Sequence, residues 1–141
     1  MVDKTLVLRK LADLESYQEQ IKEYENITVA QYKNDWKTQR IVERTLQIMI
    51  ETCADIATHI ISDQKFRVPD TYADIFRVLS EAGVLKEEFV ERLIKMVRFR
   101  NIVVHDYEKI DPEIVVGILH KHLSDFSHFN DTIVNLIKTY R

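Results

Sequence analysis

The sequence has few residues of the kinds that interrupt helices or cross-link chains. Its 141 residues include two glycines, two prolines and one cysteine. So few turn-forming residues argue against a sheet with tight turns, and the many Leu, Ile, Glu and Lys residues favour helices. The single cysteine, Cys53, excludes an internal disulfide and a cysteine-rich zinc site, and its apolar neighbours predict a buried thiol. The sequence therefore predicts an all-α protein suited to a reducing compartment.

Long apolar runs and a strong excess of one charge are also missing. Charged residues interrupt the first fifteen positions every few residues, which argues against a signal peptide. No apolar run approaches the roughly 20 residues that cross a bilayer. The formal net charge is −3, so an anionic partner would need a local basic patch. We expect a cytoplasmic protein with no membrane partner.

Apolar residues recur at helical spacing along most of the chain. The pattern predicts helices over residues 5–27, 36–62, 72–81, 86–104 and 112–140, the last with a bend near 123–125. Leu8 is expected on the buried stripe of the first helix, Asp70 as the cap of the short third helix, and Gly83 just after its end. Asp111 and Pro112 open the last helix. With no repeat or linker, we expect one domain over residues 1–141, an antiparallel four-helix bundle with an extra short helix.

The segment 92–107 combines positive charge with a histidine and a tyrosine. Four basic residues and no acidic residue occur between positions 92 and 100. Such a stretch can hold phosphates or form a solvated helix face. His105 can exchange a proton near neutral pH, while an arginine such as Arg100 can stabilise charge on phosphorus. Together they would suffice for RNA cleavage by the 2′-hydroxyl without a metal; a capping or structural role for His105 is the alternative.

Helix geometry complicates that chemistry. At about 100° per residue, Arg98, Asn101 and His105 share one face, whereas Arg100 and Tyr107 share another. Arg100 and His105 lie about 140° apart on a straight helix. They could meet if the helix ends near Val104, or if two copies of the chain bring their sites together across a two-fold axis.

The stretch "RNIVVHDY", residues 100–107, reads R-x-x-x-x-H-x-Y and resembles the active-site motif of HEPN ribonucleases, specifically the HepT-like toxin family. Residues 40–62, 66–85 and 96–115 are similar to the second helix, the middle loop with its short helix, and the motif region of that family. The resemblance covers about residues 8–135. It implies a four-helix bundle of HEPN type that forms homodimers, with both motifs lining a cleft between the protomers. Assembly beyond the dimer is left open.

The same resemblance implies a metal-independent endoribonuclease that needs no cofactor and leaves a 2′,3′-cyclic phosphate. Arg100 and His105 match the catalytic pair, and Asn101 matches the polar residue after the arginine. Arg98, on the same face as His105, is a supporting candidate. Tyr107 matches the tyrosine to which an MNT-type nucleotidyltransferase antitoxin attaches AMP, which would place bulk and negative charge where RNA phosphate binds. The implied partners are therefore RNA, that antitoxin and a second copy of the chain.

Other polar groups give weaker signals. Glu51, Asp55 and His59 recur every four residues and could form a metal site, an ordinary polar stripe or a dimer contact. His120 and His122 point to nearly opposite sides of a helix and are expected at the surface.

Three aromatic residues near the start of the chain have two possible roles. Tyr24, Tyr32 and Trp36 could stack on bases, although packing in the core or against a second copy fits better.

The alternative to an enzyme is a non-catalytic HEPN protein that binds a nucleotide, RNA or a nucleotidyltransferase through the same basic cleft.

Overall fold

The computed structural model describes residues 2–140, and within that range the chain forms helices and no strand. The predicted all-α class is therefore confirmed. The elements are α1 (Lys4–Ile21), a 3₁₀ turn η1 (Lys22–Tyr24), α2 (Val29–Lys33), α3 (Trp36–Asp63), α4 (Asp74–Glu81), α5 (Glu87–His105), a 3₁₀ turn η2 (Tyr107–Lys109), α6 (Pro112–Lys121) and α7 (Ser124–Lys138). None of these helices is long and apolar enough to cross a membrane.

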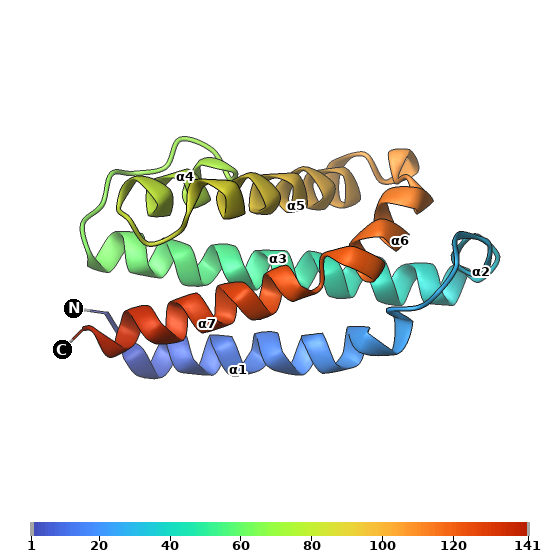
Figure 1. The fold of residues 1–141 in the computed structure, drawn as a ribbon. Coiled ribbons are helices and arrows are strands. Elements are labelled where there is room, and N and C mark those ends of the chain that lie inside the picture. The colour runs from blue at the N-terminus through green and yellow to red at the C-terminus, as the bar shows by residue number, and fades with distance from the viewer. Residues whose placement is uncertain (1, 141) are drawn as a thin grey trace.

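Four long segments run antiparallel, as predicted. Helix α3 lies in the middle, with α1 and α7 packed on one side and α5 on the other (Figure 1). Helices α6 and α7 together make the fourth segment, and the break between them falls at the predicted bend. The extra short helix, α4, packs against α3 and α5. Helix α1 begins and α7 ends at the same end of the bundle (Figure 1).

Helix α3 supplies much of the core. Asp35 caps it by accepting hydrogen bonds from the amides of Lys37 and Thr38. Cys53 is 1 % exposed, as expected, and burial raises the pKa of its thiol. The helix also buries one carboxylate, that of Glu43. The apolar residues buried along α3 are Val42, Leu46, Met49, Ile50, Cys53, Ala54, Ile56, Ala57, Ile60 and Ile61.

The first predicted helix is too long, and its first buried residue is Val7 instead of Leu8, whereas Leu11, Leu14 and Ile21 are buried as predicted. Helix α1 ends at Ile21, after which the chain tightens into η1. Thr28 and Gln31 then form a capping box that starts α2. Leu8 is 50 % exposed, because Val7 occupies the buried position that is in register with the later core residues of α1.

The loop before α4 is held by a buried carboxylate rather than by the predicted cap. The Asp74 carboxylate accepts hydrogen bonds from both terminal nitrogens of Arg67, at 2.7 and 2.9 Å, and from the Asp70 amide at 2.9 Å. Asp70 does not cap the helix: its N-cap residue is Ala73, which makes no side-chain cap, and the Thr71 hydroxyl accepts from the Asp74 amide at 3.1 Å. The Arg67 guanidinium holds the pKa of the Asp74 carboxyl well below its usual range. At the other end of α4, Gly83 adopts the predicted left-handed conformation, with φ at 78°.

The three singled-out aromatic residues differ in burial. Tyr32 is 1 % exposed and belongs to the core, and Tyr24 is half-buried against it. Trp36 is 64 % exposed, so it does not pack in the core, and its packing against a second copy stays a prediction. It occupies the first position of α3, before the buried stripe of that helix begins.

Candidate functional site

The Arg100 guanidinium lies near the end of α5 and is held by three groups. Its Nη2 donates to Glu51 Oε2 on α3 at 3.1 Å, and its Nη1 donates to Asn101 Oδ1 at 3.1 Å. Its Cζ lies 4.3 Å from the centre of the Tyr72 ring, which the α4 loop supplies. The side chain is 17 % exposed. Arg100 Nε is buried and has no hydrogen-bond partner within residues 2–140, so this arginine is oriented and its buried Nε–H donor is not used.

His105 is the last residue of α5 and is exposed to solvent. The Asp106 amide still donates to the Ile102 carbonyl at 2.9 Å, so the backbone is helical up to the histidine. The helix ends one residue beyond Val104, close to its predicted end, and still includes His105. Arg100 and His105 are separated by about 7.5 Å along the axis and about 140° around it. The structure records no hydrogen bond or ion pair between them in the range it describes.

Tyr107 leaves the helix and returns toward α3. Asp106 adopts φ −135° and ψ 50°, so Tyr107 starts the 3₁₀ turn η2. The expectation that Arg100 and Tyr107 share a helical face is therefore wrong. Its hydroxyl donates to Glu43 Oε1 and accepts from Arg40 Nη1. Burial and the hydrogen bond to Glu43 raise the pKa of Tyr107 to about 12, although the Arg40 charge opposes the shift. The phenol is therefore neutral at physiological pH.

Comparison with known proteins identifies the family. The family model described as "Ribonuclease HepT-like" matches residues 14–133. The chain belongs to the HepT-like ribonuclease family. As a member of it, the protein is an endoribonuclease.

Two curated relatives illustrate the similarity of sequence. An mRNA nuclease HepT of Shewanella oneidensis is 38 % identical over 104 residues, which cover 74 % of this chain and 78 % of the relative. A tRNA nuclease HepT of Aphanizomenon flos-aquae is 29 % identical over 114 residues, covering 81 % of this chain and 78 % of that one.

Solved structures show the same fold. A tri-AMPylated Shewanella oneidensis HEPN toxin, solved in complex with an MNT antitoxin, superposes with a TM-score of 0.86 at 33 % identity. The match covers 96 % of this chain and 99 % of that one. A toxin–antitoxin crystal structure with AMP-PNP gives a TM-score of 0.87 at 32 % identity, over 94 % and 99 % of the two chains. The predicted HEPN-type bundle is confirmed.

Sequence reasoning missed Glu43, the buried partner of the HepT-like motif tyrosine. Glu43 is 5 % exposed; one carboxylate oxygen accepts from Tyr107, and the other accepts from the Tyr32 hydroxyl. The available signal was a carboxylate at a core position of α3, three residues before Leu46 and seven before Ile50. A hollow of about 180 Å³ adjoins this group. Its lining residues are Tyr32, Gln39, Arg40, Glu43, Tyr107, Ile110 and Pro112.

The polar stripe on α3 does not converge on a metal. Glu51 binds Arg100, Asp55 lies 3.9 Å from Lys10, and His59 Nε2 lies 3.1 Å from Asp63 Oδ2. Within residues 2–140, no group of three or more His, Cys, Asp and Glu side chains could hold a metal ion. These contacts fit an ordinary polar stripe, and the alternative of a dimer contact stays a prediction.

The remaining sequence candidates lie at the surface. His120 is exposed, and its Nε2 donates to the Ile27 carbonyl at 2.7 Å. The His122 side chain is 45 % exposed and lies 3.6 Å from Asp125. Arg98 is exposed on α5. None of these residues contacts the Arg100 guanidinium.

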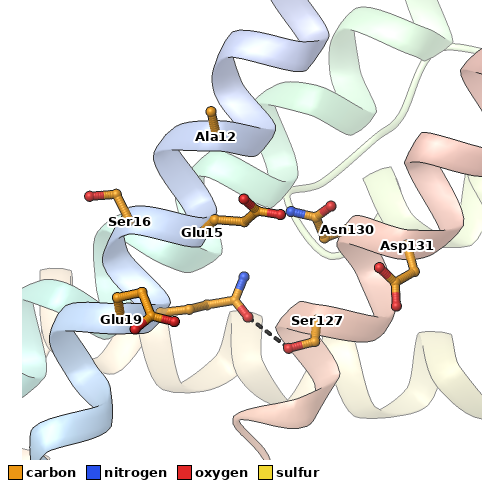
Figure 2. Close-up of a pocket in the computed structure, with 8 residues that line it drawn as sticks. Ala12, Glu15, Ser16, Glu19, Ser127, Asn130 and Asp131 are labelled. Carbon is orange, nitrogen blue, oxygen red and sulfur yellow. Dashed lines mark hydrogen bonds between the residues drawn. The ribbon is translucent and has the colours of Figure 1, made fainter.

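A wide hollow between α1 and α7 is acidic. Figure 2 shows the carboxylates of Glu15 and Glu19 on one side and that of Asp131 on the other, with the Ser127 hydroxyl donating to a glutamine between them. The partner of Ser127 is Gln18, at 2.7 Å. Three carboxylates repel RNA phosphates, so this face is unsuited to a nucleic acid.

Proposed function

We propose that this HepT-like protein cleaves RNA without a metal ion, by attack of a 2′-hydroxyl on the adjacent phosphate. The observation that supports this most strongly is an oriented arginine and an exposed histidine at the end of one helix. His105 exchanges the proton as general base or acid, which contributes roughly 10²–10⁴-fold. Arg100 stabilises the negative charge that develops on phosphorus, and Asn101 orients its guanidinium at 3.1 Å. Arg98 adds an exposed positive charge on the His105 face.

The test is cleavage of a single-stranded RNA in excess EDTA. We expect the parent protein to cut, and both His105→Ala and Arg100→Ala to be slower by about 100-fold or more. Arg9→Ala, which removes an exposed arginine from α1, serves as the matched control and should cut at the parent rate. If both site variants cut as fast as the parent, the assignment of the site is wrong. A protein that binds RNA without cutting it would favour the non-catalytic alternative.

We further infer that the working site is a cleft between two copies of the chain. The support is geometric, since one helix places Arg100 and His105 about 140° apart. Mixing Arg100→Ala protein with His105→Ala protein tests this directly. A mixed dimer has one cleft with an intact Arg100 from one chain and an intact His105 from the other, so activity returns. Mixed dimers, verified by mass, that stay inactive would contradict a shared site.

The protein is also proposed to be the toxin of a pair with an MNT-type nucleotidyltransferase, which inactivates it by adding AMP to Tyr107. The similar Shewanella oneidensis HEPN toxin, tri-AMPylated and in complex with an MNT antitoxin, supports this. Tyr107 is 39 % exposed, so a partner can contact its side chain. Co-expression with the nucleotidyltransferase should add the mass of AMP to the peptide that contains Tyr107. If AMP is found only on other peptides, the acceptor is wrong.

A further inference from the structure

Glu43 is an unusual residue for the place it occupies. It is 5 % exposed and lies on the core side of α3. Burying a carboxylate there costs hydration free energy, a cost that an apolar side chain would not have. Both carboxylate oxygens are engaged, one by the Tyr32 hydroxyl and the other by the Tyr107 hydroxyl. Arg40 Nη1 lies 3.7 Å from Glu43 Oε1. A buried carboxylate that directly contacts the phenol of Tyr107 is placed to act on that phenol.

We propose that Glu43 is the general base for AMP transfer to Tyr107, and that Arg40 binds the phosphate being transferred. The inference rests on the proposed role of Tyr107 as the AMP acceptor. The co-reactant is a nucleoside triphosphate, ATP, presented by the nucleotidyltransferase partner. Glu43 is thereby a catalytic residue for the modification and not for RNA cleavage.

The step balances without any other reactant. The Tyr107 phenolic oxygen attacks the α-phosphorus of ATP, forming an oxygen–phosphorus bond. The bond between that phosphorus and the bridging oxygen of the pyrophosphate breaks, and pyrophosphate leaves. The phenolic proton passes along the existing hydrogen bond to Glu43 Oε1. Tyr32 continues to donate to the other oxygen of Glu43, which keeps the newly protonated carboxyl in place.

A base is needed because the phenol does not ionise by itself at neutral pH. The pKa of Tyr107 is raised to about 12 by burial and by its contact with Glu43. A neutral phenol is a weak nucleophile, and removal of its proton during the attack lowers the barrier. Glu43 Oε1 already accepts the hydrogen bond of that phenolic proton.

The surroundings also explain why only one of the two phenols on Glu43 would react. Tyr107 is 39 % exposed, whereas Tyr32 is 1 % exposed and cannot be reached by a nucleotide. The Arg40 side chain is 54 % exposed, and its Cζ lies 4.9 Å from the centre of the Tyr107 ring. Its guanidinium donors therefore face the place where the phosphate arrives, and an arginine fork suits phosphate oxygens. The hollow of about 180 Å³ beside these groups gives room for part of the incoming group.

The decisive variant is Glu43→Gln, because an amide keeps an acceptor for the Tyr107 hydroxyl but cannot take its proton. The purified protein, its nucleotidyltransferase partner and ATP are mixed, and AMP incorporation is followed by intact mass. We expect Glu43→Gln to be modified about 100-fold more slowly at neutral pH. Its rate should rise about tenfold per pH unit as phenolate becomes available, whereas the parent rate should be nearly level between about pH 7 and 9.

Glu108→Gln is the matched control, since it removes the same charge from the exposed residue next to Tyr107. It should be modified at the parent rate. A Glu43→Gln protein that is modified at the parent rate with a level pH profile overturns the inference. If Glu43→Gln does not fold, the pH dependence of AMP transfer to the parent protein is the test. A parent rate that rises tenfold per pH unit through neutral pH would show that no side chain acts as the base.

The proposed function can fail separately from this inference. If Tyr107→Phe protein gains AMP as fast as the parent, the acceptor is another residue and the proposed role of Tyr107 is wrong. If AMP goes to Tyr107 in the parent and at an equal rate in Glu43→Gln, only the base is wrong. Arg40→Ala should slow the transfer while leaving its pH profile level, because it removes a phosphate ligand and not the base.

Discussion

Replacing Glu51 with glutamine tests how Arg100 is held. The Glu51 and Arg100 side chains are 29 % and 17 % exposed, and the atoms Oε2 and Nη2 lie 3.1 Å apart. Glutamine keeps an oxygen acceptor of similar reach but removes the negative charge. Tyr72 and Asn101 continue to contact the guanidinium. We therefore expect Arg100 to stay in place but to be held less firmly.

The expected size follows from the kind of hydrogen bond that is lost. A hydrogen bond to a charged group contributes about 1.5–3 kcal/mol; in the variant the guanidinium keeps its charge and the acceptor loses its own, so a part of that contribution is lost. Partial solvent exposure screens the pair, so that part is small, about 1 kcal/mol. Since about 1.4 kcal/mol corresponds to tenfold, kcat for RNA cleavage should fall about fivefold. KM should stay level or fall, because the uncompensated guanidinium attracts RNA phosphate more strongly.

The assay is steady-state cleavage of a short single-stranded RNA in EDTA. Asp55→Asn, which removes an exposed carboxylate one turn further along α3, is the control and should change kcat less than about twofold. In an Arg100→Ala background, Glu51→Gln should cause no further loss, because its effect passes through Arg100. An unchanged kcat, or an equal loss in that background, would refute the reasoning.

Three further predictions concern stability. Tyr32→Phe should lower the free energy of unfolding by about 1.5–3 kcal/mol in urea, since the lost hydroxyl donates to the buried Glu43 carboxylate; a loss below about 0.5 kcal/mol would contradict this. Arg67 lowers the pKa of Asp74 in the folded state. The stabilisation that the Asp74 carboxylate gives is therefore fully present above its pKa in the unfolded chain, about 3.9, and is lost as pH falls through its lower pKa in the folded protein. Asp74→Asn should therefore flatten the fall in stability below about pH 4, and an unchanged acid limb would count against the Arg67 contact. Gly83→Ala should lower the free energy of unfolding in urea by about 1 kcal/mol. The φ angle is 78° and an added Cβ meets no atom within 4 Å, so backbone strain is the only cost, and an unchanged free energy of unfolding would contradict this.

The helices with strong apolar periodicity could be predicted from the sequence. Helix α3 was expected over residues 36–62 and extends over Trp36–Asp63, because its buried stripe repeats without interruption. The end of α1 could not be predicted, since the stripe continues through Tyr24 while the backbone tightens at Lys22. A periodic pattern reports which residues face the core and not the local hydrogen bonding that ends a helix.

The candidate residues of the site could be named from the sequence, but their contacts could not. Glu51 lies 49 positions from its partner Arg100, and Glu43 lies 64 positions from its partner Tyr107. Tyr107 reaches Glu43 only because Asp106 leaves the helical conformation, a single-residue event that periodicity does not show. Tertiary contacts of this kind depend on the packing of α3 against α5.

The central claim, that Arg100 and His105 cleave RNA through its own 2′-hydroxyl without a metal, is tested most directly by the chemistry of the cut ends. An RNA of defined sequence is digested in EDTA and its fragments are weighed by mass spectrometry. We expect 2′,3′-cyclic phosphate and 5′-hydroxyl ends from the parent protein, and intact RNA from Arg100→Ala and His105→Ala. Fragments with 3′-hydroxyl and 5′-phosphate ends, or cleavage that EDTA abolishes, would contradict it.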